Sequence, residues 1–103
     1  MIADIALHRE ELRQLCRRFH VRRLDLFGSA ARDDFDPARS DLDFLVEFDP
    51  STSDALSLKT YFGLKESLET LFGRGVDLIE PAALRNPYVK ASIERSRELL
   101  FAA

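Results

Sequence analysis

Cysteine, tryptophan and methionine are scarce in this sequence of 103 residues, which has one Cys, no Trp and one Met. Because Cys16 is alone, the chain cannot form an intramolecular disulfide, and we expect a protein of the reducing cytoplasm, in which Cys16 is a small core residue. Long apolar runs are also lacking, since no stretch approaches the ~18 residues of a membrane span. The first residues show neither the basic segment nor the apolar run of a secretion signal.

An excess of basic residues is lacking too. The chain has 15 Lys and Arg against 18 Asp and Glu, a formal charge of −3 and a pI near 5.3. Tight non-specific binding of nucleic acid needs a basic face, so we expect no direct nucleic-acid partner. Since no apolar run is long enough to span a membrane, we expect no membrane partner either. At 46% hydrophobic and 32% charged residues the composition is that of a folded globular protein. Its length predicts one domain over residues 1–103.

Two apolar runs, residues 24–27 and 42–48, predict strands, and acids interrupt the second one at alternate positions. Asp is depleted in strands, so Asp41 and Asp43 call for an explanation. In an extended strand both carboxylates point to one face, about 6.6 Å apart along the chain. There they could bind Mg²⁺, which proteins hold by one or two carboxylates together with substrate phosphates. Alternatively, Asp41 only starts the strand and Asp43 is solvated at an edge.

A Gly-Ser turn follows the first of these strands. Gly28 permits close approach of the backbone, and Ser29 offers a hydroxyl where the strand passes into a short helix-compatible segment. Arg32, one turn further on, can make a bidentate contact with a phosphate oxygen. If the two strands are neighbours, phosphate donors and metal carboxylates meet at one end of a sheet. That arrangement suits phosphoryl or nucleotidyl transfer.

A third strand is predicted over residues 76–79, again with an acid, Asp77, inside an apolar run. If this strand pairs beside the strand with the two aspartates, Asp77 completes a cluster of three carboxylates. The alternative is an ordinary edge aspartate after the Gly-Arg-Gly turn. Glu47 and Glu80 are the other candidates for a third acid.

Three segments have helical periodicity. Residues 5–19 predict an amphipathic helix, with the arginines around its end forming a solvated last turn: Arg17, Arg18, Arg22 and Arg23. Residues 53–72 predict a second helix, which Gly73 ends. Asn86 should cap a last helix that starts with Pro87 and has an apolar stripe of Tyr88, Val89, Ile93 and Leu100. The tail at 99–101 is either core or a partner surface, and core is the default.

The resulting fold class is α/β (α+β), a small mixed sheet of about three strands against three to four helices. Within it, LFGSAAR and DLDFLV, with eleven residues between Ser29 and Asp41, closely resemble the signature of the minimal nucleotidyltransferases. These belong to the DNA polymerase beta-like nucleotidyltransferase superfamily. The resemblance implies a polymerase beta-like palm in which paired acids bind divalent metal, here two Mg²⁺ ions, and the Gly-Ser loop with its Arg holds the triphosphate of ATP. It also implies a third carboxylate on a later strand, which favours Asp77.

Members of this family are commonly antitoxins of modules whose toxin is a helical HEPN-domain RNase. The resemblance therefore implies a Mg²⁺-dependent transfer of AMP from ATP to a tyrosine hydroxyl of a cognate HEPN toxin in a type VII-like toxin–antitoxin module. So short a chain leaves little to bind an acceptor, which also favours a protein partner and a hetero-oligomer. Asp33 stands where the family commonly has Gly, and the acids of residues 33–36 favour an alternative, a non-catalytic antitoxin that acts by binding. A third alternative is a standalone transferase for a small hydroxylated acceptor.

Overall fold

The structure is a computed structural model, and it describes residues 3–28, 31, 41–51 and 58–103. The start of the predicted second helix, residues 53–57, lies outside the described residues. The elements follow one another along the chain as α1 (Ala3–Leu7), α2 (Arg9–Arg18), β1 (Val21–Phe27), β2 (Leu42–Phe48), α3 (Leu58–Phe72), β3 (Val76–Ile79), a short 3-10 helix (Pro81–Ala83), α4 (Pro87–Ser96) and β4 (Glu98–Ala102). No helix within these described ranges is long and apolar enough to cross a membrane.

The strands form one four-stranded mixed sheet in the order β3-β2-β1-β4. β1 pairs antiparallel with both β2 and β4, whereas β2 and β3 are parallel. The parallel pair is joined by a crossover through α3, as parallel neighbours require. The predicted mixed α/β fold is therefore confirmed, with a fourth strand added at the edge beside β1.

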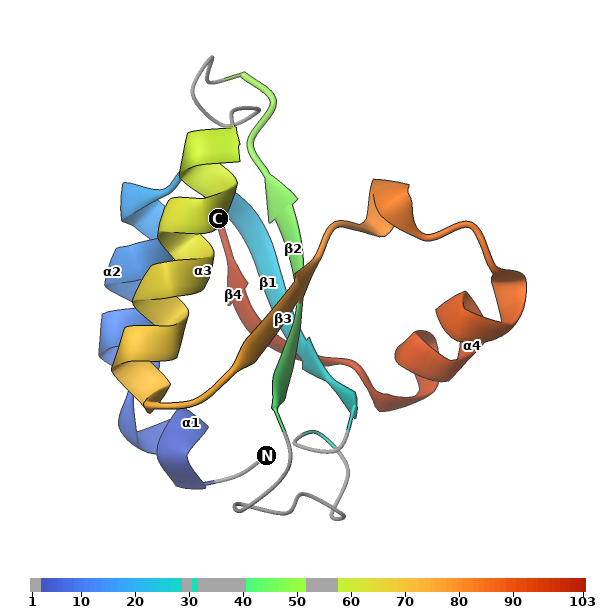
Figure 1. Ribbon diagram of the computed structural model, residues 1–103, viewed down its shortest axis with the longest axis horizontal. Coiled ribbons are helices and arrows are strands. Elements are labelled where there is room, and N and C mark those ends of the chain that lie inside the picture. Colours follow the sequence, from blue (N-terminus) through green and yellow to red (C-terminus); the bar gives the residue numbers. More distant parts are fainter. Residues whose placement is uncertain (1–2, 29–30, 32–40, 52–57) are drawn as a thin grey trace.

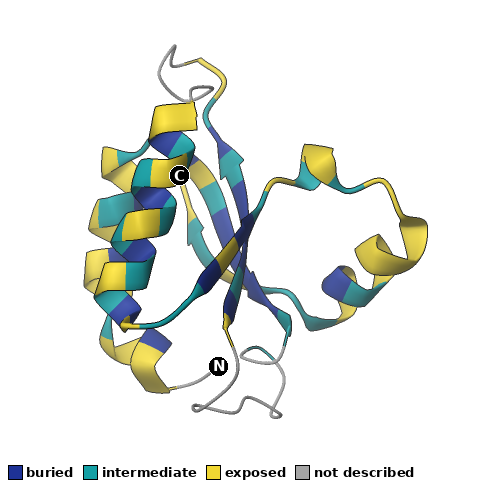
Figure 2. Cartoon of the chain, viewed as in Figure 1, coloured by how far each residue is buried: buried dark blue, intermediate teal, exposed yellow. Residues whose placement is uncertain are grey.

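Period-two alternation divides the sheet into two faces (Figure 1). One face packs against α2 and α3, and its core includes Leu24, Leu42, Phe44, Leu64 and Leu68. The other face lies toward α4, where a smaller buried cluster brings together Phe27, Leu45 and Ile93. Most residues of β1 and β2 are accordingly buried, whereas β4 is only partly covered and most of α4 is exposed (Figure 2). The aspartates of β2 and β3 belong to this second, less covered face.

The predicted helix over residues 5–19 is broken. His8 has φ −109° and ψ 22°, outside the helical range, and it separates α1 from α2. The expectation for Arg22 and Arg23 is wrong, because both lie in β1 rather than at a helix end. The strand begins as early as Val21 because the chain turns at His20, between α2 and β1. The backbone of His20 has a left-handed φ of 60°.

The last helix begins as expected and ends earlier. Asn86 caps it, with Oδ1 accepting the backbone N–H groups of Tyr88 (2.9 Å) and Val89 (3.4 Å). The placement of Leu100 on that helix is wrong, because α4 ends at Ser96 and residues 98–102 form β4. Pairing with β1 puts Leu100 and Phe101 against the main core, as the default expectation for the tail has it. For Leu99 that expectation is wrong, because this residue is 49% exposed.

Candidate active site

The three predicted acids lie at one end of the sheet. β1 ends where β2 begins because the two are antiparallel, and β3 begins at that end because it runs parallel to β2. Asp43 lies directly opposite Phe27 of β1 on one side and directly opposite Asp77 of β3 on the other. Asp41 precedes β2, and beside it the N–H of Leu42 donates to the carbonyl of Gly75 over 3.1 Å. The structure thus places Asp41, Asp43 and Asp77 at the same end of the sheet as Gly28.

Two glycines make room for the paired aspartates. A Cβ atom on Gly28 would lie less than 3.0 Å from Oδ2 of Asp43 and 3.2 Å from its Cγ, so the carboxylate packs directly on the glycine backbone. Gly28 also has a φ of +73°, which L side chains rarely adopt. At Gly75, a Cβ atom would lie 2.7 Å from Oδ1 of Asp41. Each position therefore requires glycine for the neighbouring aspartate to keep its place.

The acids differ in exposure. Asp41 and Asp77 are exposed, and Asp43 is half-buried between its neighbouring strands. Carboxylate oxygens are the ligands that Mg²⁺ uses, so the chemistry of this donor set fits that ion. Within residues 3–28, 31, 41–51 and 58–103, no three His, Cys, Asp or Glu side chains are gathered as a ready metal site. Asp41 instead faces Gly75, which precedes β3, and Asp43 faces Gly28, which follows β1.

The remaining sequence candidates divide into two groups. Ser29, Arg32 and the acidic residues 33–36 lie outside the described residues, and their predicted roles stay predictions. Glu47 is described, and it lies near the opposite end of β2, where it accepts a hydrogen bond from Arg22 over 3.1 Å. Glu80 directly follows β3 and is exposed. Of the three candidates for the third acid, Asp77 is the one in register with Asp43.

Sequence reasoning missed a buried ion pair on the same face. Asp25 of β1 is fully buried and accepts two hydrogen bonds from Arg23, at 3.0 and 3.2 Å, and one from Arg97 Nε at 2.5 Å. Burial by itself lowers the pKa of Arg97, but its hydrogen bonds to Asp25 and Glu94 raise that pKa above its ordinary value. The available signal was an acid inside the apolar run of residues 24–27. Asp25 can be buried because Arg23 and Arg97 donate hydrogen bonds to its carboxylate and neutralise its charge.

Tyr61 of α3 ties the helix to β3. Its hydroxyl donates to the backbone carbonyl of Leu78, the residue after Asp77. Burial raises the pKa of Tyr61, and the negative charges of Glu80 and Asp77 add to the effect. The phenol is thus kept neutral and remains a donor, and β3 is held in place next to the acids.

The model of the nucleotidyltransferase domain family matches residues 8–100, nearly the whole chain. The chain belongs to this family. Its relatives include a protein of Methanocaldococcus jannaschii named "Putative protein adenylyltransferase", which is 43% identical over 77 residues, 75% of this chain and 74% of the relative. The recognised resemblance and the enzyme class are therefore confirmed: the protein is a nucleotidyltransferase.

Solved structures agree. A structure described as a "putative minimal nucleotidyltransferase" matches with a TM-score of 0.73 and 32% identity over 91% of this chain and 90% of the other. A toxin–antitoxin structure with AMP-PNP matches with a TM-score of 0.69 and 18% identity over 92% of this chain and 73% of the other. A third is a complex of tri-AMPylated Shewanella oneidensis HEPN toxin with its MNT antitoxin (TM-score 0.65, 18% identity, 96% of this chain and 73% of the other). At such identities these two complexes show the shared fold.

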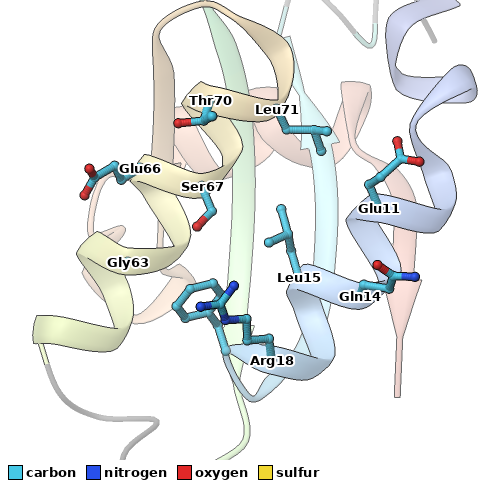
Figure 3. A pocket seen from close by; sticks show the side chains of 10 residues that line it. Glu11, Gln14, Leu15, Arg18, Gly63, Glu66, Ser67, Thr70 and Leu71 are labelled. Atoms are coloured by element: carbon cyan, nitrogen blue, oxygen red, sulfur yellow. The ribbon is translucent and has the colours of Figure 1, made fainter.

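A pocket of about 630 Å³ in this nucleotidyltransferase lies away from the acids. It is formed between α2 and α3, and its lining includes Leu15, Arg18, Gly63, Ser67 and Leu71 (Figure 3). Those helices cover the opposite face of the sheet from the one that carries the aspartates. The pocket is therefore separate from the strand ends where Asp41, Asp43 and Asp77 lie.

Cys16 has no part in the site. It is fully buried in the main core, and burial raises the pKa of its thiol to about 12. A thiol protonated at neutral pH is a poor nucleophile. The prediction of a small core residue at Cys16 is borne out.

Proposed function

We propose that this nucleotidyltransferase transfers AMP from ATP to a tyrosine hydroxyl of a cognate HEPN toxin, and thereby acts as the antitoxin of a two-protein module. The observation that carries the proposal is the register of β2 and β3, which sets Asp43 opposite Asp77, with Gly28 packed against the Asp43 carboxylate. Support for a protein acceptor comes from the relative named as a protein adenylyltransferase. The single buried Cys16 suits the reducing cytoplasm, where we place the reaction.

Each site residue has a proposed role. Asp41, Asp43 and Asp77 would hold two Mg²⁺ ions, which when bound neutralise the charge that develops on the phosphates. The Gly28 backbone, the Ser29 hydroxyl and the Arg32 guanidinium would hold the β- and γ-phosphates of ATP. Gly28, Asp41, Asp43 and Asp77 lie at the ends of paired strands, where the sheet holds their backbones in place, so they can orient the triphosphate.

The chemistry is an in-line displacement at the α-phosphorus. The tyrosine oxygen forms a bond to that phosphorus, and the bond from the phosphorus to the oxygen bridging to the β-phosphate breaks. Pyrophosphate leaves, and the carboxylate of Asp77, exposed at the open side of the site, takes the hydroxyl proton. The residues of the chain thus supply positioning and proton acceptance, and no covalent enzyme intermediate is needed.

Charge favours a protein over a nucleic acid as the acceptor. The chain carries a formal charge of −3, and two of the three site acids are exposed. A polyanionic acceptor would be repelled there, whereas a neutral tyrosine hydroxyl on a protein would not. The fold is shared with antitoxins that have been solved in complex with HEPN toxins, which supports a hetero-oligomer with such a partner.

The test is a mass measurement on the proposed partner, the cognate HEPN toxin. After incubation with the chain, ATP and Mg²⁺, the toxin should gain the mass of one or more AMP groups on tyrosine, located by peptide fragmentation. Removal of Mg²⁺ with EDTA should abolish the gain. The analogue α,β-methylene-ATP, whose α–β bridge resists cleavage, should bind and leave the toxin unmodified.

The same experiment separates the alternative function. If toxicity is suppressed while the toxin keeps its mass, the chain acts by binding alone and the proposed transfer is wrong. If a small hydroxylated compound is adenylylated and the toxin is not, the acceptor has been misassigned.

A further inference from the structure

The last turn of α4 contacts the glycine turn of the site from 68 positions away. The backbone N–H of Gly28 donates to Oγ of Ser96 over 3.3 Å. The same Oγ lies 3.4 Å from the carbonyl oxygens of Ser92 and Ile93, to which its own proton can be donated. A serine hydroxyl has one proton and two lone pairs, so it can donate to the helix and accept from Gly28 at once.

A buried ion pair fixes the position of Ser96. The next residue, Arg97, donates through Nε to the fully buried carboxylate of Asp25 over 2.5 Å. Asp25 lies on β1 only three residues before Gly28. The end of α4 is therefore attached to β1 at two neighbouring points, one at Asp25 and one at Gly28. Such a double attachment defines where the Ser96 oxygen lies relative to the turn.

Gly28 in turn supports a site acid. The Asp43 carboxylate packs on the Gly28 backbone so closely that a Cβ atom there would overlap Oδ2. A shift of Gly28 by a few tenths of an ångström would remove or tighten this contact, and the direction of the carboxylate would change with it. The hydroxyl of Ser96, the N–H of Gly28 and the carboxylate of Asp43 thus form one continuous chain of contacts.

We infer that Ser96 is a positioning residue of the transferase: its hydroxyl holds the Gly28 turn against Asp43, and α4 thereby orients the carboxylate. The inference deepens the proposed function and rests on it. It assigns Ser96 no contact with ATP or with the acceptor. Without the hydroxyl, the half-buried Gly28 N–H loses its acceptor and the turn is held less firmly.

The experiment compares three variants with the wild-type chain. Ser96→Ala removes the acceptor, Ser96→Thr keeps a hydroxyl, and Ser92→Ala removes a hydroxyl from the preceding turn of the same helix while keeping the carbonyl that Ser96 contacts. We expect Ser96→Ala to lower kcat for AMP transfer about tenfold or more, with a Tm close to that of Ser92→Ala. The Gly28 amide should exchange its proton faster in Ser96→Ala, as measured by NMR. Ser96→Thr should restore most of kcat and most of the protection of the Gly28 amide. Ser92→Ala should change neither kcat nor the exchange of that amide.

The outcomes separate this inference from the function on which it rests. If Ser96→Ala transfers AMP at the wild-type rate, or if Ser92→Ala loses as much, the positioning role is overturned and the proposed function stands. If the wild-type chain itself transfers no AMP, the proposed function fails. In that case the NMR measurement still tests whether the Ser96 hydroxyl holds the Gly28 turn. Equal exchange of the Gly28 amide in wild type and Ser96→Ala would overturn this contact's role.

Discussion

Gly28 and Gly73 offer a matched pair for testing what the glycine turn does. Both have left-handed backbones, with φ of +73° and +64°. Their surroundings differ, because a Cβ atom on Gly73 would meet nothing within 4 Å, whereas one on Gly28 would overlap the Asp43 carboxylate. Replacing each with alanine therefore imposes the same kind of backbone strain, but only Gly28→Ala displaces a site acid.

The expected stability loss is similar for the two variants. An L residue in the left-handed region costs about 1–2 kcal/mol. Part of this, about 0.4–1 kcal/mol, is offset because alanine makes the unfolded chain less flexible. The net loss of roughly 1 kcal/mol corresponds to a fall in Tm of about 4–8 °C for a domain of this size. The extra cost at Gly28 is small, because the group that must yield is the end of the Asp43 side chain.

The expected activities are different. Gly73→Ala should transfer AMP at the wild-type rate, whereas Gly28→Ala should be about 100-fold slower, since misplacement of a site group by about 1 Å has effects of that size. Thermal unfolding followed by circular dichroism gives Tm, and the rate of toxin modification gives the activity. Equal activity of the two variants, whether both retain or both lose transfer, would refute the reasoning.

Further predictions concern stability. Asp25→Asn leaves two arginines without their carboxylate and should lower the free energy of unfolding, measured with urea, by about 3 kcal/mol. This is the low end for a broken buried ion pair, because Arg23 is 43% exposed. A loss below about 1 kcal/mol would contradict the prediction. Asn86→Ala removes the α4 cap and should cost about 1 kcal/mol, whereas an unchanged urea midpoint would show that the cap contributes nothing. The pKa of Cys16 is raised by burial to about 12, so stability should fall as pH rises above 9, where the unfolded thiol ionises first; Cys16→Ala should lack this part of the slope.

Local patterns predicted the strands around the site well. The bounds expected for β2 and β3 agree with the structure, because alternation of apolar and acidic residues is set within each strand. The register that joins Asp43 to Asp77 could be stated only as a condition, since strand pairing depends on the crossover through α3.

Features that depend on distant partners were not predicted. β4 directly follows α4 with no glycine or proline between them, and pairing with β1 is what makes it a strand. Asp25 is buried because Arg97, 72 positions later, neutralises it. Ser96 gives no sign in the sequence that its hydroxyl reaches Gly28. In each case the decisive contact joins the C-terminal part of the chain to β1 or to Gly28, the residue after it.

The central claim is that Asp43 and Asp77 act together at one end of the sheet. Its most direct test is transfer of label from ATP radiolabelled at the α-phosphate to the toxin, by Asp43→Asn, Asp77→Asn and the control Glu47→Gln, whose side chain pairs with Arg22 at the other end of β2. We predict that both aspartate variants keep the wild-type Tm and lose transfer at least about 100-fold, while Glu47→Gln remains active. Wild-type rates in Asp43→Asn and Asp77→Asn would contradict the claim.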